Sequence, residues 1–327
     1  MEVNEVALSG KKVLDEVGRA VVGKREVLEK ILAAALAGGH VLLEDFPGLG
    51  KTLIARSFAR ALGLGFRRIQ FTPDLLPADI TGGYVYNRAS GQFDLRQGPV
   101  FTNILLADEI NRASPKTQSA LLEAMQENQV SLEGETLPLP DPFIVLATQN
   151  PIEYEGTFPL PEAQLDRFLV RLSLGYPEPA EEQAILQQRR LRQKETVELE
   201  AVLPTSGLLE MRAAVETVYV HPDLEAYIVA VVGETRRDRH VAVGASPRAS
   251  LALMKLARAQ AALSGRDYVL PDDIKAYIHP VLAHRLLLLP EYWMRKKLIS
   301  DVIHTALRSV PVPVLAAPSE QAAPEQH

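Results

Sequence analysis

The chain has 327 residues, of which 47% are hydrophobic and 23% are charged, values that are typical of a soluble globular protein. This length suits one large domain or two ordinary ones with an ample core. The net charge of −6 gives no global electrostatic reason for binding nucleic acid or an anionic membrane. The absence of cysteine excludes disulfides, thiolate metal sites and a cysteine nucleophile.

No stretch of the sequence predicts export or membrane insertion. Residues 1–10 carry two glutamates and lack the apolar core of a signal peptide. No apolar run approaches the ~18 residues that a membrane helix requires. We therefore expect a cytoplasmic protein with no membrane insertion.

The N-terminal part predicts two helices before the first strand. Residues before about Val17 have a weak helical pattern, and residues 21–23 form a short apolar bend. Residues 24–37 have a clear amphipathic period, which predicts a helix. Residues 41–44 then predict a short buried strand.

The turn after this strand carries the strongest chemical signal. Its glycines would let backbone N–H groups close on a phosphate chain, and Lys51, at the start of the next helix, would reach the terminal phosphates. The Thr52 hydroxyl suits a nucleotide-bound Mg²⁺. Asp45 stands where the strict pattern has glycine, so its carboxylate must point away from the phosphates. The alternative is an ordinary glycine-rich turn. The predicted nucleotide-binding residues of this turn are Pro47, Gly48, Leu49, Gly50, Lys51 and Thr52.

The following segments alternate strands with helices. Their apolar strands predict an α/β fold with a parallel sheet that helices cover on both faces. Alternating patterns around glycine turns predict two hairpins as well. The expected strands are residues 66–71, 103–107, 143–148 and 168–174, and the expected hairpins are residues 84–95 and 130–139.

The C-terminal part has a different pattern. From about residue 177 to residue 310 the sequence has only helical periods. Residues 311–327 are rich in Pro, Ala, Gln and Glu without a period, so we expect disorder there.

Polar residues follow two of the buried strands. Asp108 and Glu109 stand at the carboxyl end of one strand, where ligands of parallel sheets bind. Asp108 could hold Mg²⁺ through water, and Glu109 could orient and deprotonate an attacking water. Asn150 could hold that water or the γ-phosphate, although Asn-Pro is also an ordinary turn opener. The simplest interpretation of Asp166 and Arg167 is a surface ion pair.

Five blocks together resemble the signature motifs of MoxR-type AAA+ ATPases. They are collinear from about Val17 to Leu289, and their combination is far more specific than any one block. Glu44-Asp45 also resembles that family. The blocks are residues 47–52 (Pro-Gly-Leu-Gly-Lys-Thr), 107–113 (Ala-Asp-Glu-Ile-Asn-Arg-Ala), 147–151 (Ala-Thr-Gln-Asn-Pro), 165–168 (Leu-Asp-Arg-Phe) and 244–248 (Gly-Ala-Ser-Pro-Arg).

The resemblance implies a definite domain plan. Residues 1–176 would form the AAA+ P-loop core, with a parallel five-stranded sheet and the two hairpins. One hairpin would interrupt helix 2, one would precede the sensor-1 strand, and both would face the pore of a ring. Residues 177–310 would form a smaller all-α lid, and residues 311–327 a disordered tail. ATP would bind between the core and the lid.

The resemblance also implies roles for the site residues. Lys51 and Thr52 would be the Walker A pair, and Asp108 and Glu109 the Walker B pair. The remaining roles are Val22 and Gly23 for adenine contact, Asn150 for sensor 1, Arg248 for sensor 2, Arg167 for the arginine finger, and Arg112 for a second trans arginine. A structural salt bridge is the alternative for Arg112, and whether Arg248 acts in its own subunit or on a neighbour stays open.

The implied function is ATP hydrolysis, with ATP and Mg²⁺ as cofactors, in a hexameric ring. The family remodels or matures client protein complexes, often by metal or cofactor insertion, and a von Willebrand factor A-domain protein is the usual partner. A magnesium-chelatase-like motor subunit is the nearest alternative. A nucleic-acid motor is a further one, although the acidic chain and the lack of a DNA-binding module argue against it. The last is a nucleotide-gated scaffold that scarcely turns over.

Overall fold

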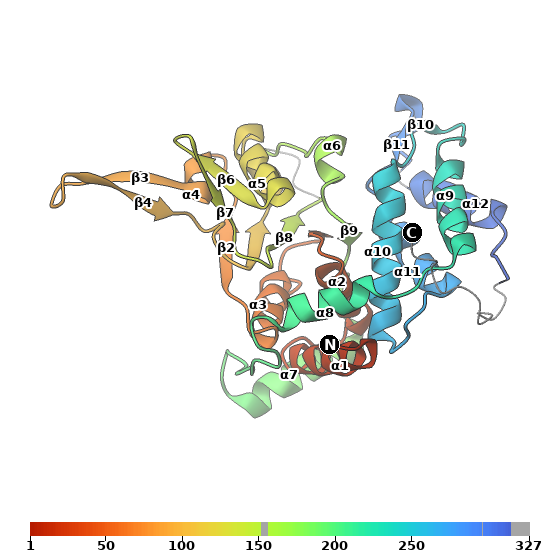
Figure 1. The fold of residues 1–327 in the computed structure, drawn as a ribbon, viewed down its shortest axis with the longest axis horizontal. Coiled ribbons are helices and arrows are strands. Elements are labelled where there is room, and N and C mark those ends of the chain that lie inside the picture. The colour runs from red at the N-terminus through yellow and green to blue at the C-terminus, as the bar shows by residue number, and fades with distance from the viewer. Residues whose placement is uncertain (152–155, 296, 315–327) are drawn as a thin grey trace, which may run out of the picture.

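The computed structural model describes residues 1–151, 156–295 and 297–314. Its centre is a sheet of five parallel strands in the order β2-β5-β8-β1-β9 (Figure 1). The predicted parallel α/β sheet is therefore confirmed. The strands are β1 (Val41–Glu44), β2 (Phe66–Gln70), β5 (Ile104–Asp108), β8 (Ile144–Gln149) and β9 (Val170–Leu172).

The two faces of the sheet belong to different hydrophobic clusters. Alternate strand residues such as Leu43 and Leu106 face helices α1 to α3, whereas Leu42 and Leu105 face the layer that contains α5. This alternation follows from the two-residue period of a strand. The covering elements are α1 (Val3–Gly18), α2 (Arg25–Leu36) and α3 (Lys51–Ala61) on the first face, and α4 (Pro77–Thr81), the 3-10 helix Ile110–Arg112, α5 (Pro115–Glu127) and α6 (Glu162–Leu165) on the second side of the molecule.

Both predicted hairpins are present. The first pairs β3 (Gly82–Asn87) with β4 (Gln92–Gln97), and Figure 1 shows it extending well away from the body of the molecule. The second pairs β6 (Gln129–Leu132) with β7 (Glu135–Pro138). The Tyr84 hydroxyl donates to the Glu135 carboxylate at 2.6 Å, so the two hairpins are in direct contact.

The C-terminal part is mostly helical. Helices α8, α9 and α11 pack against α10, which also contacts α1 and α2, and α12 packs against α9 and α11. One expectation needs correction, because β10 (Val241–Val243) and β11 (Leu287–Leu288) form an antiparallel pair. Strands of three and two residues are too short to show a period in the sequence. The helices are α7 (Pro179–Arg192), α8 (Gly207–Glu216), α9 (Pro222–Thr235), α10 (Pro247–Leu263), α11 (Pro271–Leu282), the 3-10 helix Pro290–Tyr292 and α12 (Lys297–Ser309).

The N-terminal helix α1 is better formed than the sequence suggested. It buries Val6, Val13, Leu14 and Val17 in a cluster that also contains residues of α8 to α12 and of the sheet. The core of the C-terminal helices is thus continuous with one face of the sheet. The division at residue 176 stays a prediction.

The end of the described chain has no regular structure. Residues 311–314 are neither helix nor strand and are largely exposed, while the rest of the predicted disordered tail lies outside the described residues. Among the helices of residues 1–151, 156–295 and 297–314, none is long and apolar enough to cross a membrane.

Candidate functional site

The glycine-rich turn lies at the carboxyl end of β1 and leads directly into α3. Gly48 and Gly50 have φ angles of 83° and 82°, a conformation that other residues rarely adopt. A Cβ atom at either position would meet nothing within 4 Å, so the backbone conformation rather than space requires glycine. The open turn and the free N–H groups of the first turn of α3 can surround an anion.

Lys51 is the first residue of α3 and is buried. Its ammonium group donates to the backbone oxygen of Asp45 at 2.7 Å. Burial lowers the pKa of Lys51, and the charges of Asp45, Asp108 and Glu109 oppose this shift. The ammonium therefore lies near all three carboxylates, at the point where the sequence predicts the terminal phosphates.

The Asp45 side chain points away from this turn, as the sequence required. One carboxylate oxygen accepts hydrogen bonds from the Ser173 hydroxyl at 2.7 Å and from the Gly175 N–H at 3.1 Å. The other accepts from the Leu174 N–H at 2.5 Å. This buried carboxylate ties the start of the P-loop to the segment that follows β9.

The predicted adenine-contacting bend, Val22 and Gly23, lies close to the same turn. The next residue, Lys24, donates to the backbone oxygen of Tyr176 at 2.8 Å. The Tyr176 ring in turn lies 5.8 Å from that of Phe46, just before the P-loop. The bend, the P-loop and Tyr176 therefore surround one region.

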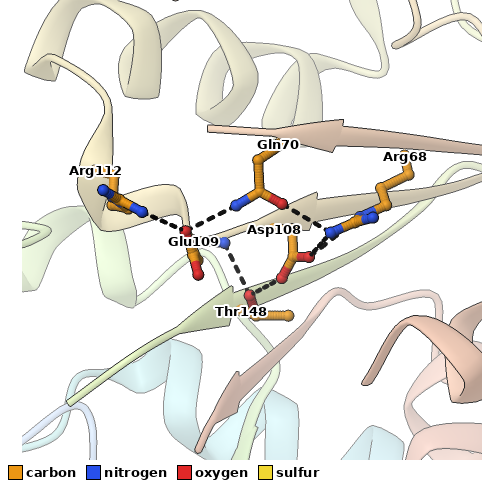
Figure 2. A network of polar contacts seen from close by, with 6 residues as sticks. All are labelled: Arg68, Gln70, Asp108, Glu109, Arg112 and Thr148. Atoms are coloured by element: carbon orange, nitrogen blue, oxygen red, sulfur yellow. Dashed lines mark hydrogen bonds and ion pairs between the residues drawn. The ribbon is translucent and has the colours of Figure 1, made fainter. Parts of the chain in front are cut away.

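The Asp108 carboxylate lies in a polar network that joins three neighbouring strands (Figure 2). One oxygen accepts from the Thr148 hydroxyl at 2.6 Å, and the other accepts from Arg68 at 2.6 and 3.1 Å. The Thr148 hydroxyl also accepts from the Glu109 N–H at 2.8 Å. Thr148 thus fixes the two acidic residues relative to each other.

Glu109 adopts a left-handed backbone conformation, with φ 56° and ψ 49°. Such a conformation is uncommon for a residue with a side chain and costs about 1–2 kcal/mol. Its carboxylate accepts from the Gln70 amide at 2.7 Å and from Arg112 at 3.1 Å. Within one chain, Arg112 therefore forms the structural salt bridge that was the alternative to a role in a neighbouring subunit.

Asn150 is buried directly after β8, the strand between β1 and β5. The N–H of Asp45 donates to the backbone oxygen of Gln149 at 3.2 Å, so the end of β8 borders the P-loop. Asn150 accordingly lies between the P-loop and the strand that carries Asp108.

Thr52 and Asp108 supply a hydroxyl and a carboxylate oxygen, the hard oxygen ligands that Mg²⁺ prefers. The described ranges contain no cluster of three or more His, Cys, Asp or Glu residues that could hold a metal by itself. The donor set therefore fits an ion that takes its other ligands from phosphates and water.

Arg167 and Arg248 lie at the opposite end of the sheet. Arg167 lies just before β9. The N–H of Leu169, the residue before β9, donates to the backbone oxygen of His40, the residue before β1. Arg248 approaches Asp166 at 3.6 Å, and both arginines line one pocket of about 330 Å³. The four residues of β1 alone span ~13 Å between this pocket and the P-loop.

One sequence interpretation changes as a result, and the open question about Arg248 narrows. Within one chain, the expected ATP site between core and lid does not include Arg248. The interpretation of Asp166 and Arg167 as a surface pair is wrong, because Asp166 pairs with Arg285 and Arg248 while Arg167 donates to the backbone oxygen of Leu122 at 2.6 Å. Packing of α10 against α1 and α2 places Arg248 there.

The sequence interpretation missed four residues of these two sites: Arg68, Gln70, Thr148 and Arg285. Arg68 and Gln70 are two positions apart on β2 and therefore share one face of the strand, and Gln70 is in register with Asp108. Polar residues on one face at the end of a strand could have drawn attention to them. Nothing local marks Arg285.

Comparison with known proteins agrees with this geometry. The profile of the "ATPase family associated with various cellular activities (AAA)" matches residues 40–170, and that of the "AAA lid domain" matches residues 233–306. The uncharacterized protein YeaC of Bacillus subtilis is 50% identical over 305 residues, which are 93% of this chain and 94% of that protein. Chaperone MoxR1 of Mycobacterium tuberculosis is 45% identical over 319 residues, 95% of this chain and 84% of that protein.

A solved structure is also similar over nearly the whole chain. The crystal structure of a Cytophaga hutchinsonii protein, described as a candidate ATPase, has a TM-score of 0.88 and 41% sequence identity, and the match covers 95% of this chain and 97% of that one. The matches to the profiles and relatives extend across both the sheet and the C-terminal helices. The chain belongs to the MoxR family of AAA+ ATPases.

Proposed function

We propose that this chain hydrolyses ATP in a homo-oligomeric, hexameric ring in which neighbouring subunits share each active site. One observation carries this proposal. Lys51, Asp108 and Glu109 gather at the carboxyl end of the sheet, whereas Arg167 and Arg248 gather at the amino end. Only a second copy can bring two such half-sites together.

The first half-site would bind and activate the substrate. The P-loop N–H groups and Lys51 bind the phosphates, and Val22 and Gly23 border the adenine. Mg²⁺, held by Thr52 and through water by Asp108, would neutralise charge on the β- and γ-phosphates. Glu109 orients and deprotonates the attacking water, and Asn150 holds that water or the γ-phosphate.

The second half-site would supply positive charge. Arg167 of a neighbouring subunit acts as the arginine finger, and Arg248 acts beside it as a sensor 2 in trans. An arginine finger contributes 10³–10⁵ in rate, or roughly 4–7 kcal/mol of barrier. An isolated subunit should therefore be nearly inactive. Arg112 is the second candidate for this role.

The Glu109→Gln variant tests the catalytic assignment. It should bind ATP and assemble, yet turn over at least 100-fold more slowly, because the amide cannot accept the proton from water. Glu123→Gln is the matched control, since Glu123 is an exposed residue of α5. ATP hydrolysis by the Glu109→Gln variant within a few-fold of the control would refute the role of Glu109 as base.

Mixing two inactive variants tests the shared site. Lys51→Ala lacks phosphate binding but keeps its finger, and Arg167→Ala keeps its pocket but lacks the finger. Activity should reappear when the two exchange subunits. Lys51→Ala mixed with Glu109→Gln is the control without rescue, because both changes damage the pocket. Near-normal activity of Arg167→Ala alone would remove Arg167 from the site and leave Arg112 to be tested.

Hydrolysis would drive remodelling or maturation of a client protein complex in the cytoplasm. The similarity to Chaperone MoxR1 supports a chaperone-like role. Metal or cofactor insertion is the more specific version, with a von Willebrand factor A-domain protein as partner and the two hairpins in contact with the client. Capture by the Glu109→Gln variant in ATP, compared with the same variant in ADP, should retain that partner and the client. Retention of neither would count against this role.

The alternatives make different predictions. A nucleic-acid motor should be stimulated by single-stranded DNA, with an effect that falls steeply as salt rises. A magnesium-chelatase-like subunit should assemble with a chelatase partner. A nucleotide-gated scaffold should form rings in ATP but show no turnover in any mixture. We expect none of these results and no nucleic-acid partner.

A further inference from the structure

Asp166 connects the sheet-containing part of the chain to two arginines of the C-terminal part, Arg248 at the start of α10 and Arg285 in the turn between α11 and β11. It follows α6 and precedes β9. One carboxylate oxygen accepts from Nε of Arg285 at 2.6 Å, and the other lies 3.6 Å from Nη1 of Arg248. A single carboxylate therefore holds two guanidinium groups from different elements.

Arg285 is fully engaged inside the chain. Its side chain is only 4% exposed. Its Nε donates to the Asp166 carboxylate, and its two terminal nitrogens donate to backbone oxygens at 2.6–3.3 Å. The oxygens belong to Asp166, Phe168, Leu169 and Val281. Arg285 thus has a structural position and no nitrogen left for an external ligand.

Arg248 has the opposite environment. Its side chain is 57% exposed at the start of α10, and Asp166 is the acidic group beside it. Burial lowers the pKa of Arg285, and the positive charge of Arg248 also acts in this direction, so the two cations repel each other. The Asp166 carboxylate offsets this repulsion, and it directly precedes Arg167 in the sequence.

We propose that Asp166 and Arg285 are positioning residues that set the spacing of the two arginines offered to a neighbouring subunit. Arg285 fixes the Asp166 carboxylate, and this carboxylate holds Arg248 beside Arg167. The arginine from the sheet-containing part and the arginine from the C-terminal helices then meet the neighbour's nucleotide as one unit. The inference rests on the proposed shared site.

The Asp166→Asn variant is the direct test, with Glu162→Gln as control. Glu162 is an exposed acid on the adjoining helix α6, so the same acid-to-amide change is made without touching the two arginines. We expect the kcat of Asp166→Asn to fall at least 10-fold. Its affinity for ATP should stay within two-fold of the control, because its own P-loop is at the other end of the sheet.

Mixing shows on which side of the interface the defect lies. Asp166→Asn should regain activity with Lys51→Ala, which has an intact arginine pair, and should not regain it with Arg167→Ala. A merely structural role would damage the pocket as well and would abolish rescue by Lys51→Ala. If Lys51→Ala rescues Arg167→Ala but does not rescue Asp166→Asn, the proposal is overturned.

A double-mutant cycle with Arg248→Ala makes the test independent of folding. If Asp166 acts through Arg248, the kcat of the variant with both changes should be no more than about three-fold below that of the more damaged single variant. If the loss of kcat in the double variant equals the product of the two single losses, the two residues act independently and the proposal is overturned. Arg285→Lys provides the second variant, since lysine keeps the charge but cannot make the forked contacts, and it should give the same rescue pattern as Asp166→Asn.

The failures of the two proposals differ. Normal turnover of Asp166→Asn together with an inactive Arg167→Ala would refute the positioning role and leave the shared site intact. An active Arg167→Ala would refute the shared site itself. Activity is compared at equal subunit concentration, with ring assembly checked by light scattering.

Discussion

Changing Asp45 to asparagine should weaken both the fold and nucleotide binding. The buried carboxylate accepts three hydrogen bonds, from Ser173, Leu174 and Gly175. An amide has only one acceptor oxygen, so at least one buried backbone N–H faces an NH₂ group instead. An unsatisfied buried donor costs about 1–3 kcal/mol, and each remaining bond loses about 1 kcal/mol when its acceptor is no longer charged.

These contributions sum to about 3–5 kcal/mol of unfolding free energy. For a chain of 327 residues that corresponds to a fall of roughly 4–7 °C in Tm. Lys51 donates to the backbone oxygen of Asp45, so a displaced Asp45 also displaces the ammonium that would bind phosphate. We therefore expect affinity for ATP to fall at least 10-fold.

Glu44→Gln is the matched control for this experiment. Glu44 lies one residue away and pairs with Arg171 at 3.3 Å, but both side chains are about one-third exposed. Such a pair contributes about 0–1 kcal/mol. Thermal unfolding and titration with a fluorescent nucleotide would measure both variants. If Asp45→Asn differs from Glu44→Gln by less than 2 °C and two-fold in affinity, the anchoring role assigned to Asp45 is wrong.

Three further predictions concern other parts of the molecule. Burial lowers the pKa of His40 to about 4, so the folded chain binds fewer protons than the unfolded chain as pH falls below 6.5. The free energy of unfolding, measured in urea, should therefore fall by about 3 kcal/mol by pH 4 because of this residue. This fall should be absent in His40→Gln. Arg68→Ala should lower the Mg²⁺ concentration that half-saturates nucleotide binding by about 2–5-fold, since it removes a positive charge 2.6 Å from Asp108. Because Arg68 is 46% exposed, its ion pair with Asp108 contributes under about 1 kcal/mol to folding. Deleting residues 311–327 should leave Tm and ATPase rate unchanged, because a segment without apolar periodicity adds nothing to a core; a fall of several degrees would show that it docks.

The sheet and the half-site on it were predictable because their rules are local. Apolar strands ending in polar residues predict which ends of a parallel sheet carry ligands. Asp108 and Asn150 follow this rule directly, and Lys51 follows the glycine-rich turn after β1. Asp45 was predictable by exclusion, since a carboxylate cannot face phosphates.

Motifs named Arg167 and Arg248, but their position at the other end of the sheet was not predictable from motifs alone. The position of Arg248 depends on where α10 packs against α1 and α2, which is a property of the whole core. The partner of Asp166 is 119 residues away in sequence. Long-range contacts of this kind leave no local pattern in the sequence, and the strands β10 and β11 are too short to leave one.

In the proposed shared site, the separation of Lys51 and Asp108 from Arg167 and Arg248 restricts how subunits can associate. A two-fold dimer could pair a pocket with an arginine pair only if one interface patch spanned both ends of the sheet, because that patch must contact its own copy. A head-to-tail contact instead joins the pocket on one surface to the arginine pair on a different surface, and such contacts close into a ring when the rotation allows.

Head-to-tail association predicts the shape of the mixing curve. When a fraction x of subunits is Lys51→Ala and the rest is Arg167→Ala, a competent site needs an Arg167→Ala pocket beside a Lys51→Ala finger. With random exchange and independent sites, competent interfaces occur with frequency x(1 − x), which peaks at about one quarter of the normal sites at equal amounts. ATPase activity across the ratio series should follow this curve. A lower peak at the same position would mean that sites around the ring fire together, whereas a straight line between the two pure variants, with no peak, would refute the head-to-tail arrangement.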